Sequence, residues 1–132
     1  MKAQDLLAKA IRAAASAKML LDAGDADGAC NRAYYAMFDA ARAALLASGA
    51  PFDPEIARTH SGLISAFSLH LVKTGRVPVE LGKTLNRAEE LRLVADYKGD
   101  PVEAEDAAWA VSQAQTFVTA MQNTFMPKAP TQ

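Results

Sequence analysis

The amino-acid sequence predicts an all-α protein, folded as an up-and-down bundle of about five helices. Alanine, the best helix former, supplies much of the 51% hydrophobic content, whereas β-branched residues are sparse. Apolar residues recur with the 3.6-residue period of a helix, and no segment alternates with the period of two that is typical of a strand. A chain of 132 residues has the usual size of one domain, so a single core is expected.

A glycine ends each of the first two predicted helices. The first covers about residues 4–23 and stops at Gly24, because glycine readily adopts the left-handed conformation found just past a helix end. The second covers residues 25–48 and stops at Gly49. Prolines then make residues 50–54 a loop, which is the longest connection and the one most expected to move.

Two further helices follow this loop. The third is predicted to begin at Thr59, a favourable N-cap residue, and to end at Gly75. The fourth covers about residues 78–97, after which a glycine and a proline interrupt the chain.

The fifth helix has the strongest start signal in the sequence. Asp100 is the predicted N-cap, Pro101 the first helical residue and Glu103 an acidic residue in the first turn. The helix is expected to reach about residue 125.

Short connections between these helices predict that neighbours run antiparallel. Residues 1–126 are therefore predicted to form one helical domain. Two prolines beyond it make residues 127–132 a flexible C-terminal tail.

The charge balance and the cysteine content limit the class of protein. Fourteen basic and fifteen acidic residues leave a formal net charge of -1, which argues against a broad nucleic-acid surface held by phosphate neutralisation. Cys30 is the only cysteine, so no intrachain disulfide can form, as is usual in a reducing compartment. Charges are scattered through the N-terminal segment, which resembles neither a signal peptide nor a membrane span. We expect a cytoplasmic protein with no membrane partner.

The sequence lacks the common motifs of catalysis and metal binding. It contains no glycine-rich phosphate loop and no dinucleotide fingerprint. Two histidines and one cysteine at scattered positions do not make a zinc site. Glu89 and Glu90 are adjacent and point in different directions, a poor arrangement for two catalytic carboxylates. Neither a metal nor another cofactor is expected.

One charged residue, Arg92, lies on an apolar helix face. On the predicted fourth helix it shares this face with Leu85, Ala88 and Ala95. A buried arginine is costly unless it is paired, so Arg92 either bonds a carboxylate or faces a pocket or subunit interface. The structural alternative is an ion pair with Asp96, one turn later on the same helix.

Two other features have both a structural and a functional interpretation. His60 lies in line with the apolar face of the third helix, and is either a hydrogen-bonded histidine at a helix start or a ligand. Asn31, Tyr35 and Arg42 follow one flank of the second helix, which suits either an interface rim or the wall of a site. The remaining apolar residues of the second and fifth helices, Cys30 among them, are interpreted as core.

Four segments occur in an order that is found in a known family. They are residues 31–42 (NRAYYAMFDAAR), residues 59–64 (THSGLI), Phe67 with residues 72–75 (VKTG), and residues 92–97 (RLVADY). Together they resemble a HEPN domain of the small stand-alone bacterial or archaeal type. Each segment alone is weak evidence, but four in order are fairly specific, and they span nearly all of the chain from the second helix to the fifth.

The resemblance implies an up-and-down helical bundle that forms a homodimer. Many HEPN proteins are encoded beside a small nucleotidyltransferase and act with it as a toxin–antitoxin pair. The resemblance therefore implies a nucleotidyltransferase partner, with RNA or a nucleotide as the ligand. Active members are metal-independent ribonucleases, in which an arginine is followed four to six residues later by a histidine.

The chain departs from this catalytic pattern. Arg92 stands at the arginine position, but Asp96 and Tyr97 follow where the histidine is expected, and their ordinary pKa values suit proton transfer near neutral pH poorly. We first expect a binding subunit of a toxin–antitoxin module. The alternative is a ribonuclease that uses Arg92 with His60, Asp96 or Tyr97. The candidate binding residues are Asn31, Tyr35, Arg42, Ser61 and Lys73.

Overall fold

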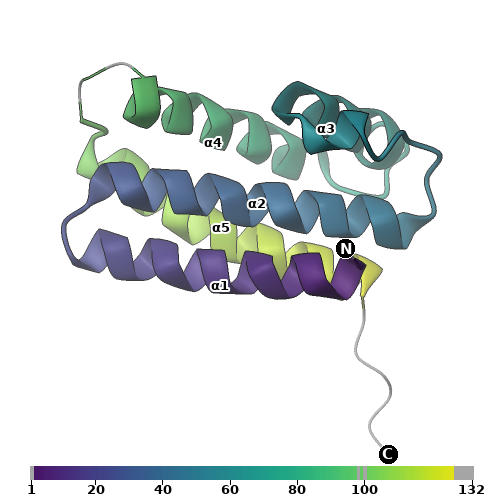
Figure 1. The fold of residues 1–132 in the computed structure, drawn as a ribbon, viewed down its shortest axis with the longest axis horizontal. Coiled ribbons are helices and arrows are strands. Elements are labelled where there is room, and N and C mark those ends of the chain that lie inside the picture. Colours follow the sequence, from purple (N-terminus) through teal and green to yellow (C-terminus); the bar gives the residue numbers. More distant parts are fainter. Residues whose placement is uncertain (1, 98, 100, 127–132) are drawn as a thin grey trace, which may run out of the picture.

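The computed structural model of the chain describes residues 2–97, 99 and 101–126, and within these it contains five α-helices and no β-strand (Figure 1). The predicted all-α bundle is confirmed. The predicted N-cap Asp100 and the predicted tail, residues 127–132, lie outside the described residues. The helices are α1 (Ala3–Asp22), α2 (Ala26–Ser48), α3 (His60–Phe67), α4 (Val79–Tyr97) and α5 (Ala104–Phe125).

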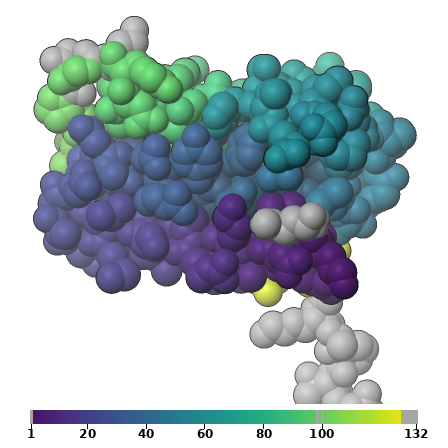
Figure 2. Space-filling view, in the orientation of Figure 1, coloured from purple at the N-terminus to yellow at the C-terminus, as the bar shows by residue number. Residues whose placement is uncertain are grey.

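Helix α2 runs through the middle of the bundle. Helices α1 and α5 pack along one side of it, and α4 and α3 lie along the other (Figure 1). In the space-filling view, α2 is visible as a band between α1 below and the α3–α4 layer above (Figure 2). The side chains predicted as core on α2 are buried: Cys30, Tyr34, Met37, Ala41 and Leu45.

The ends of α2 follow from its sequence. The Asp25 side chain caps the start by accepting a hydrogen bond from the backbone N–H of Gly28 at 2.8 Å. Gly49 ends the helix in the left-handed conformation, with φ of 74°, as its position in the sequence predicts. These two residues therefore determine the start and the end of α2, the helix that carries Asn31, Tyr34 and Tyr35.

The third predicted helix is split into two forms. Helix α3 ends at Phe67, and Ser68–Val72 continue as a π-helical turn. In this turn the backbone N–H of Lys73 donates to the carbonyl of Ser68 at 2.9 Å. The periodicity of the sequence does not separate the two forms, because each of them buries an apolar side chain, Phe67 in α3 and Leu71 in the π-helical turn.

The predicted start of the fifth helix at Pro101 is wrong, because α5 begins at Ala104. The Asp27 side chain on α2 accepts a hydrogen bond from the backbone N–H of Val102 at 2.8 Å. The side chain of Val102 is also buried. This contact with α2 holds the segment before Ala104 out of the helix, although proline and acidic residues there favour a helix start.

No helix in the described part of the chain combines the length with the apolar character that a membrane span requires.

Candidate functional site: a polar cluster between α2 and α4

Arg92 is buried where α4 packs against α2. Only 5% of the residue is exposed. Its Nη1 atom lies 3.2 Å from Oδ2 of Asp96, so the predicted ion pair along the helix is present. Asp96 is less enclosed, with 30% of its side chain exposed. The pair therefore runs from the interior of the protein to its surface.

Two tyrosines of α2 also contact the guanidinium of Arg92. The carbon atom at its centre lies 5.1 Å from the ring centroid of Tyr34 and 5.9 Å from that of Tyr35, which are cation–π distances. Burial lowers the pKa of Arg92, but the tyrosines and the hydrogen bond to Asp96 outweigh it and raise the pKa overall. The arginine is therefore held in its charged form.

The charge of Arg92 is satisfied, but one of its donors is not. The Nε atom is buried and has no hydrogen-bond partner within the described residues. In a fully satisfied buried ion pair, the arginine Nε would also donate a hydrogen bond. The enclosure of Arg92 thus relies on the two aromatic rings as much as on the carboxylate.

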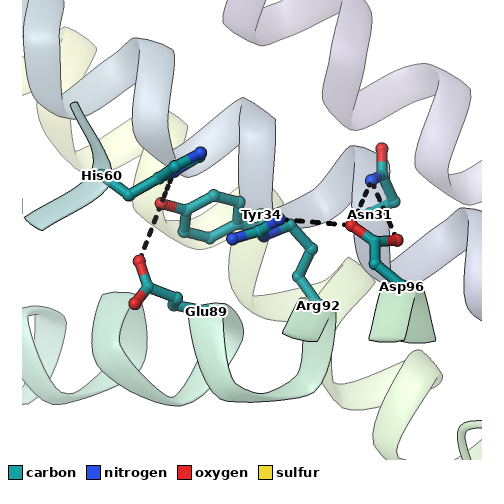
Figure 3. Close-up of polar contacts among 6 residues, drawn as sticks. All are labelled: Asn31, Tyr34, His60, Glu89, Arg92 and Asp96. Atoms are coloured by element: carbon teal, nitrogen blue, oxygen red, sulfur yellow. Dashed lines mark hydrogen bonds and ion pairs between the residues drawn. The ribbon is translucent and has the colours of Figure 1, made fainter. Parts of the chain in front are cut away.

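Asp96 links α4 to α2 through a second residue. The side-chain amide of Asn31 donates to both carboxylate oxygens of Asp96, at 3.4 and 3.5 Å (Figure 3). Tyr97 follows Asp96 and is 74% exposed. Asn31 of α2 is therefore brought together with the Arg92–Asp96 pair of α4, and the exposed Tyr97 follows this pair in the chain.

His60 joins the same cluster from α3. Its Nδ1 atom lies 2.7 Å from the phenol oxygen of Tyr34, and this phenol donates to Oε2 of Glu89 at 3.1 Å (Figure 3). The imidazole packs against Tyr34, Tyr35 and Phe38, at centroid distances of 5.5, 5.8 and 5.3 Å. His60 and Arg92 thus contact opposite parts of one tyrosine, Tyr34.

The start of α3 fixes the position of His60. The Thr59 hydroxyl accepts a hydrogen bond from the N–H of Gly62 at 3.0 Å and donates to the carbonyl of Ile56 at 2.8 Å. A Cβ atom at Gly62 would overlap that same carbonyl, so only glycine fits there. Thr59 and Gly62 therefore fix the first turn of α3, and with it the position of the His60 imidazole.

Sequence reasoning missed two members of the cluster, Tyr34 and Glu89. Tyr34 was interpreted as core, and its ring is indeed fully buried. Its phenol provided the missing signal, because a buried tyrosine hydroxyl needs a hydrogen-bond partner. Glu89 lies one turn before Arg92 on α4, on the side that reaches Tyr34.

The other candidate binding residues lie outside the cluster. Ser61 is exposed beside His60 on α3. Arg42 lies further along α2, where it lines a small hollow with Phe52 and Pro54. Lys73 is exposed after the π-helical turn. Among the residues that the structure describes, no group of three or more histidine, cysteine, aspartate or glutamate side chains could hold a metal ion.

The sequence matches a family that fits this arrangement. Residues 3–124, almost the whole chain, match the HEPN domain family. The chain belongs to this family. The resemblance inferred from four short segments is thereby confirmed over the full bundle.

Relatives of this HEPN chain are found in bacteria and archaea. A UPF0332 protein from Gloeobacter violaceus is 38% identical over 117 residues, covering 87% of this chain and 89% of that protein. A UPF0332 protein from Thermotoga maritima is 46% identical over 90 residues, covering 68% and 64%. A Methanocaldococcus jannaschii protein named "Putative toxin MJ0605" is 33% identical over 103 residues, covering 78% and 73%.

The HEPN cluster has no histidine on the helix that carries its arginine. Asp96, which stands near the expected histidine position, instead bonds Arg92 itself. The imidazole in the cluster comes from α3 and reaches it through Tyr34. The arginine and the histidine of this cluster therefore come from two different helices, α4 and α3.

Proposed function

We propose that this HEPN protein is a subunit of a toxin–antitoxin module and acts through binding, as a homodimer with a nucleotidyltransferase partner. Two kinds of observation support this. Two relatives from Methanocaldococcus jannaschii are named "Putative toxin MJ0605" and "Putative toxin MJ0142", and these names support a toxin-like role. The geometry around Arg92 favours binding over catalysis by this residue.

The enclosure of Arg92 is the observation that carries the proposal. A catalytic arginine must present its donors to the charge that develops on the substrate. Here the guanidinium is buried under two rings, and its Nη1 is bonded to Asp96. Arg92 thus acts as a fixed support that holds α4 against α2.

Several residues near this support are partly or fully exposed, and we call them the Arg92 rim. It consists of Asn31, Tyr35, Leu93, Asp96 and Tyr97. Tyr97 is 74% and Leu93 37% exposed, and exposed aromatic and apolar residues beside satisfied polar groups are typical of protein interfaces. We assign the rim to the homodimer contact.

The proposed contact with RNA or a nucleotide uses the polar edge of the rim. Asn31 and Asp96 offer hydrogen-bonding groups there, while Tyr97 and Leu93 belong to the homodimer contact. Phosphate pairing with Arg92 has no part in it, since Asp96 and the rings already surround the guanidinium. Affinity is then expected to depend only weakly on salt concentration.

Purification from the native host tests the proposal. The tagged chain is expected to bring down a nucleotidyltransferase in a fixed ratio, identified by mass spectrometry, with an untagged strain as the control. A chain that elutes as a monomer and brings down no nucleotidyltransferase would contradict the proposal.

A ribonuclease is the second candidate, and the position of His60 favours it. The imidazole lies in the same cluster as Arg92 and is held by a tyrosine that bonds a carboxylate. In this mechanism His60 takes the proton of a ribose 2′-hydroxyl and the 2′-oxygen bonds to the adjacent phosphorus. The 5′-oxygen then leaves with a proton from solvent.

Histidine variants separate this candidate from binding alone. If the enzyme candidate holds, purified protein cleaves RNA without added metal, and His60→Gln lowers the rate at least about 100-fold, the usual contribution of a general base. His70→Gln, in the π-helical turn, is the matched control and keeps the rate. Absence of cleavage by the wild type, or cleavage that survives His60→Gln, contradicts the enzyme candidate.

A further inference from the structure

We infer that Tyr34 and Glu89 are positioning residues, which hold His60 in the tautomer protonated at Nδ1 and make Nε2 the proton-accepting atom of the site. The chemical use of Nε2 rests on the ribonuclease candidate. The tautomer itself follows from the hydrogen bonds alone.

The first step is a count of protons along the chain of hydrogen bonds. The phenol of Tyr34 has one proton, and it lies between two neighbours, at 3.1 Å from Oε2 of Glu89 and 2.7 Å from Nδ1 of His60. An ionised carboxylate only accepts hydrogen bonds, so the phenol donates to Glu89. The remaining bond then requires His60 to donate from Nδ1 to the phenol oxygen.

The second step is that Tyr34 keeps its proton. Burial and the charge of Glu89 raise the pKa of the phenol far above its ordinary value, although Arg92 opposes this shift. The phenol is therefore a permanent link between the histidine and the carboxylate. Its one proton is directed at Glu89 as long as His60 donates from Nδ1.

The third step concerns the other nitrogen of the imidazole. Three rings of α2 limit the rotation of His60, since it packs against Tyr34, Tyr35 and Phe38. With Nδ1 directed at Tyr34, the second ring nitrogen points away from Glu89 (Figure 3). It bonds no group in the described part of the chain, and His60 is only partly buried. Nε2 is thus available to a proton from outside.

This arrangement is the one that a general base requires. A hydrogen bond that holds the proton on one ring nitrogen of a histidine leaves the other nitrogen as the one that accepts protons. Here a tyrosine provides that bond and passes it on to a carboxylate. Arg92 lies over the ring of the same tyrosine, so the arginine and the histidine are positioned by one residue.

Nitrogen NMR of the full-length, 15N-labelled chain tests the assignment directly. Long-range proton–nitrogen spectra show which imidazole nitrogen carries the proton, and His70→Gln leaves His60 as the only histidine to assign. At a pH where the imidazole is neutral, we expect a protonated Nδ1 and an unprotonated Nε2. A proton on Nε2 would overturn the inference.

Two pairs of variants test the positioning roles. Tyr34→Phe removes the phenol but keeps the ring under Arg92, so His60 should then populate both tautomers. Tyr35→Phe is the matched control and should leave the tautomer unchanged. Glu89→Gln can donate as well as accept, and should also mix the tautomers. Its control, Glu90→Gln, affects a residue that pairs with Arg87 on the surface.

The result is independent of the proposed function. If the tautomer is protonated at Nδ1 and shifts only in Tyr34→Phe and Glu89→Gln, the positioning roles stand even if no RNA is cleaved. If RNA is cleaved, Tyr34→Phe and Glu89→Gln should lose rate, while Glu90→Gln keeps it. A tautomer that does not respond to either variant contradicts the roles of Tyr34 and Glu89.

Discussion

The two sides of α2 are held together in different ways. Toward α1 and α5 the contacts are apolar, with alanines at close approach and large side chains such as Phe117 fully buried. Toward α4 the contacts include a buried ion pair, a shared tyrosine and a hydrogen bond from Asn31. Apolar packing is non-directional, whereas each polar contact needs its own partner at a fixed place.

The two sides of α2 therefore contribute differently to the bundle. The apolar side supplies stability by removing surface from water. The polar side is a poor source of stability, because burying charges costs much of what their attraction gains. The polar contacts instead fix the position of α4 on α2, and they thereby fix the arrangement of the residues in the Arg92 rim.

The largest expected effect is on the apolar side. Phe117→Ala removes a ring that packs against Phe67 at a centroid distance of 5.6 Å. We expect a loss of about 3–5 kcal/mol in the free energy of unfolding, measured by urea denaturation. The exposed neighbour Thr116 is the control, and Thr116→Ala should change it by less than about 0.5 kcal/mol.

A smaller effect is expected on the polar side. Arg92→Ala should lower the free energy of unfolding by about 2 kcal/mol. This loss is smaller than for a fully buried ion pair, because the side chain of Asp96 is partly exposed and water can hydrate it once Arg92 is removed. Arg92→Lys should lose about half of this, since it keeps the charge but not the planar group. The exposed Arg87–Glu90 pair provides the control, and Arg87→Ala should be nearly neutral. A neutral Arg92→Ala would show that the cluster does not hold α4.

Hydrogen exchange compares the two sides without a substitution. Helix α4 packs mainly on α2, whereas α1, α2 and α5 contact one another. The central amides of α4 should therefore open at a lower free energy than those of α2 under native conditions. Equal protection in both helices would show that the polar side is as cooperative as the apolar one.

The fold was largely predictable from local signals, and its exceptions were not. Helix ends at Gly24 and Gly49 follow from residues next to them. The start of α5 depends instead on Asp27, which is 75 residues away from Val102 and bonds its N–H. Local propensity cannot report such a contact, so Pro101 was placed inside the helix in error.

The site was predictable only in part for the same reason. The Arg92–Asp96 pair lies within one helix, and the helical period alone suggests it. The link between His60 and Glu89 joins α3 to α4 through a tyrosine of α2. Three helices must be placed before that chain of bonds can be recognised.

The smallest expected effect concerns Asp39, a buried carboxyl of α2 outside the cluster. Burial raises its pKa, against the opposing charges of Lys9, Arg42 and Arg32. Because the folded pKa lies above the unfolded one, stability falls as the pH rises through that window and stays lower above it. Asp39→Asn should therefore raise the Tm slightly at neutral pH and not at a pH below about 4. An equal change at both values would rule out this titration.

Sedimentation equilibrium at micromolar concentration tests most directly whether the Arg92 rim is a binding surface. The account predicts that the wild type is a dimer and that Tyr97→Ala shifts it to a monomer without loss of helical content. Met19→Ala should remain dimeric, because Met19 is equally exposed, at 71%, but lies on α1 across the bundle. A monomeric wild type, or a Tyr97→Ala variant that dimerises as strongly as the wild type, would contradict the account.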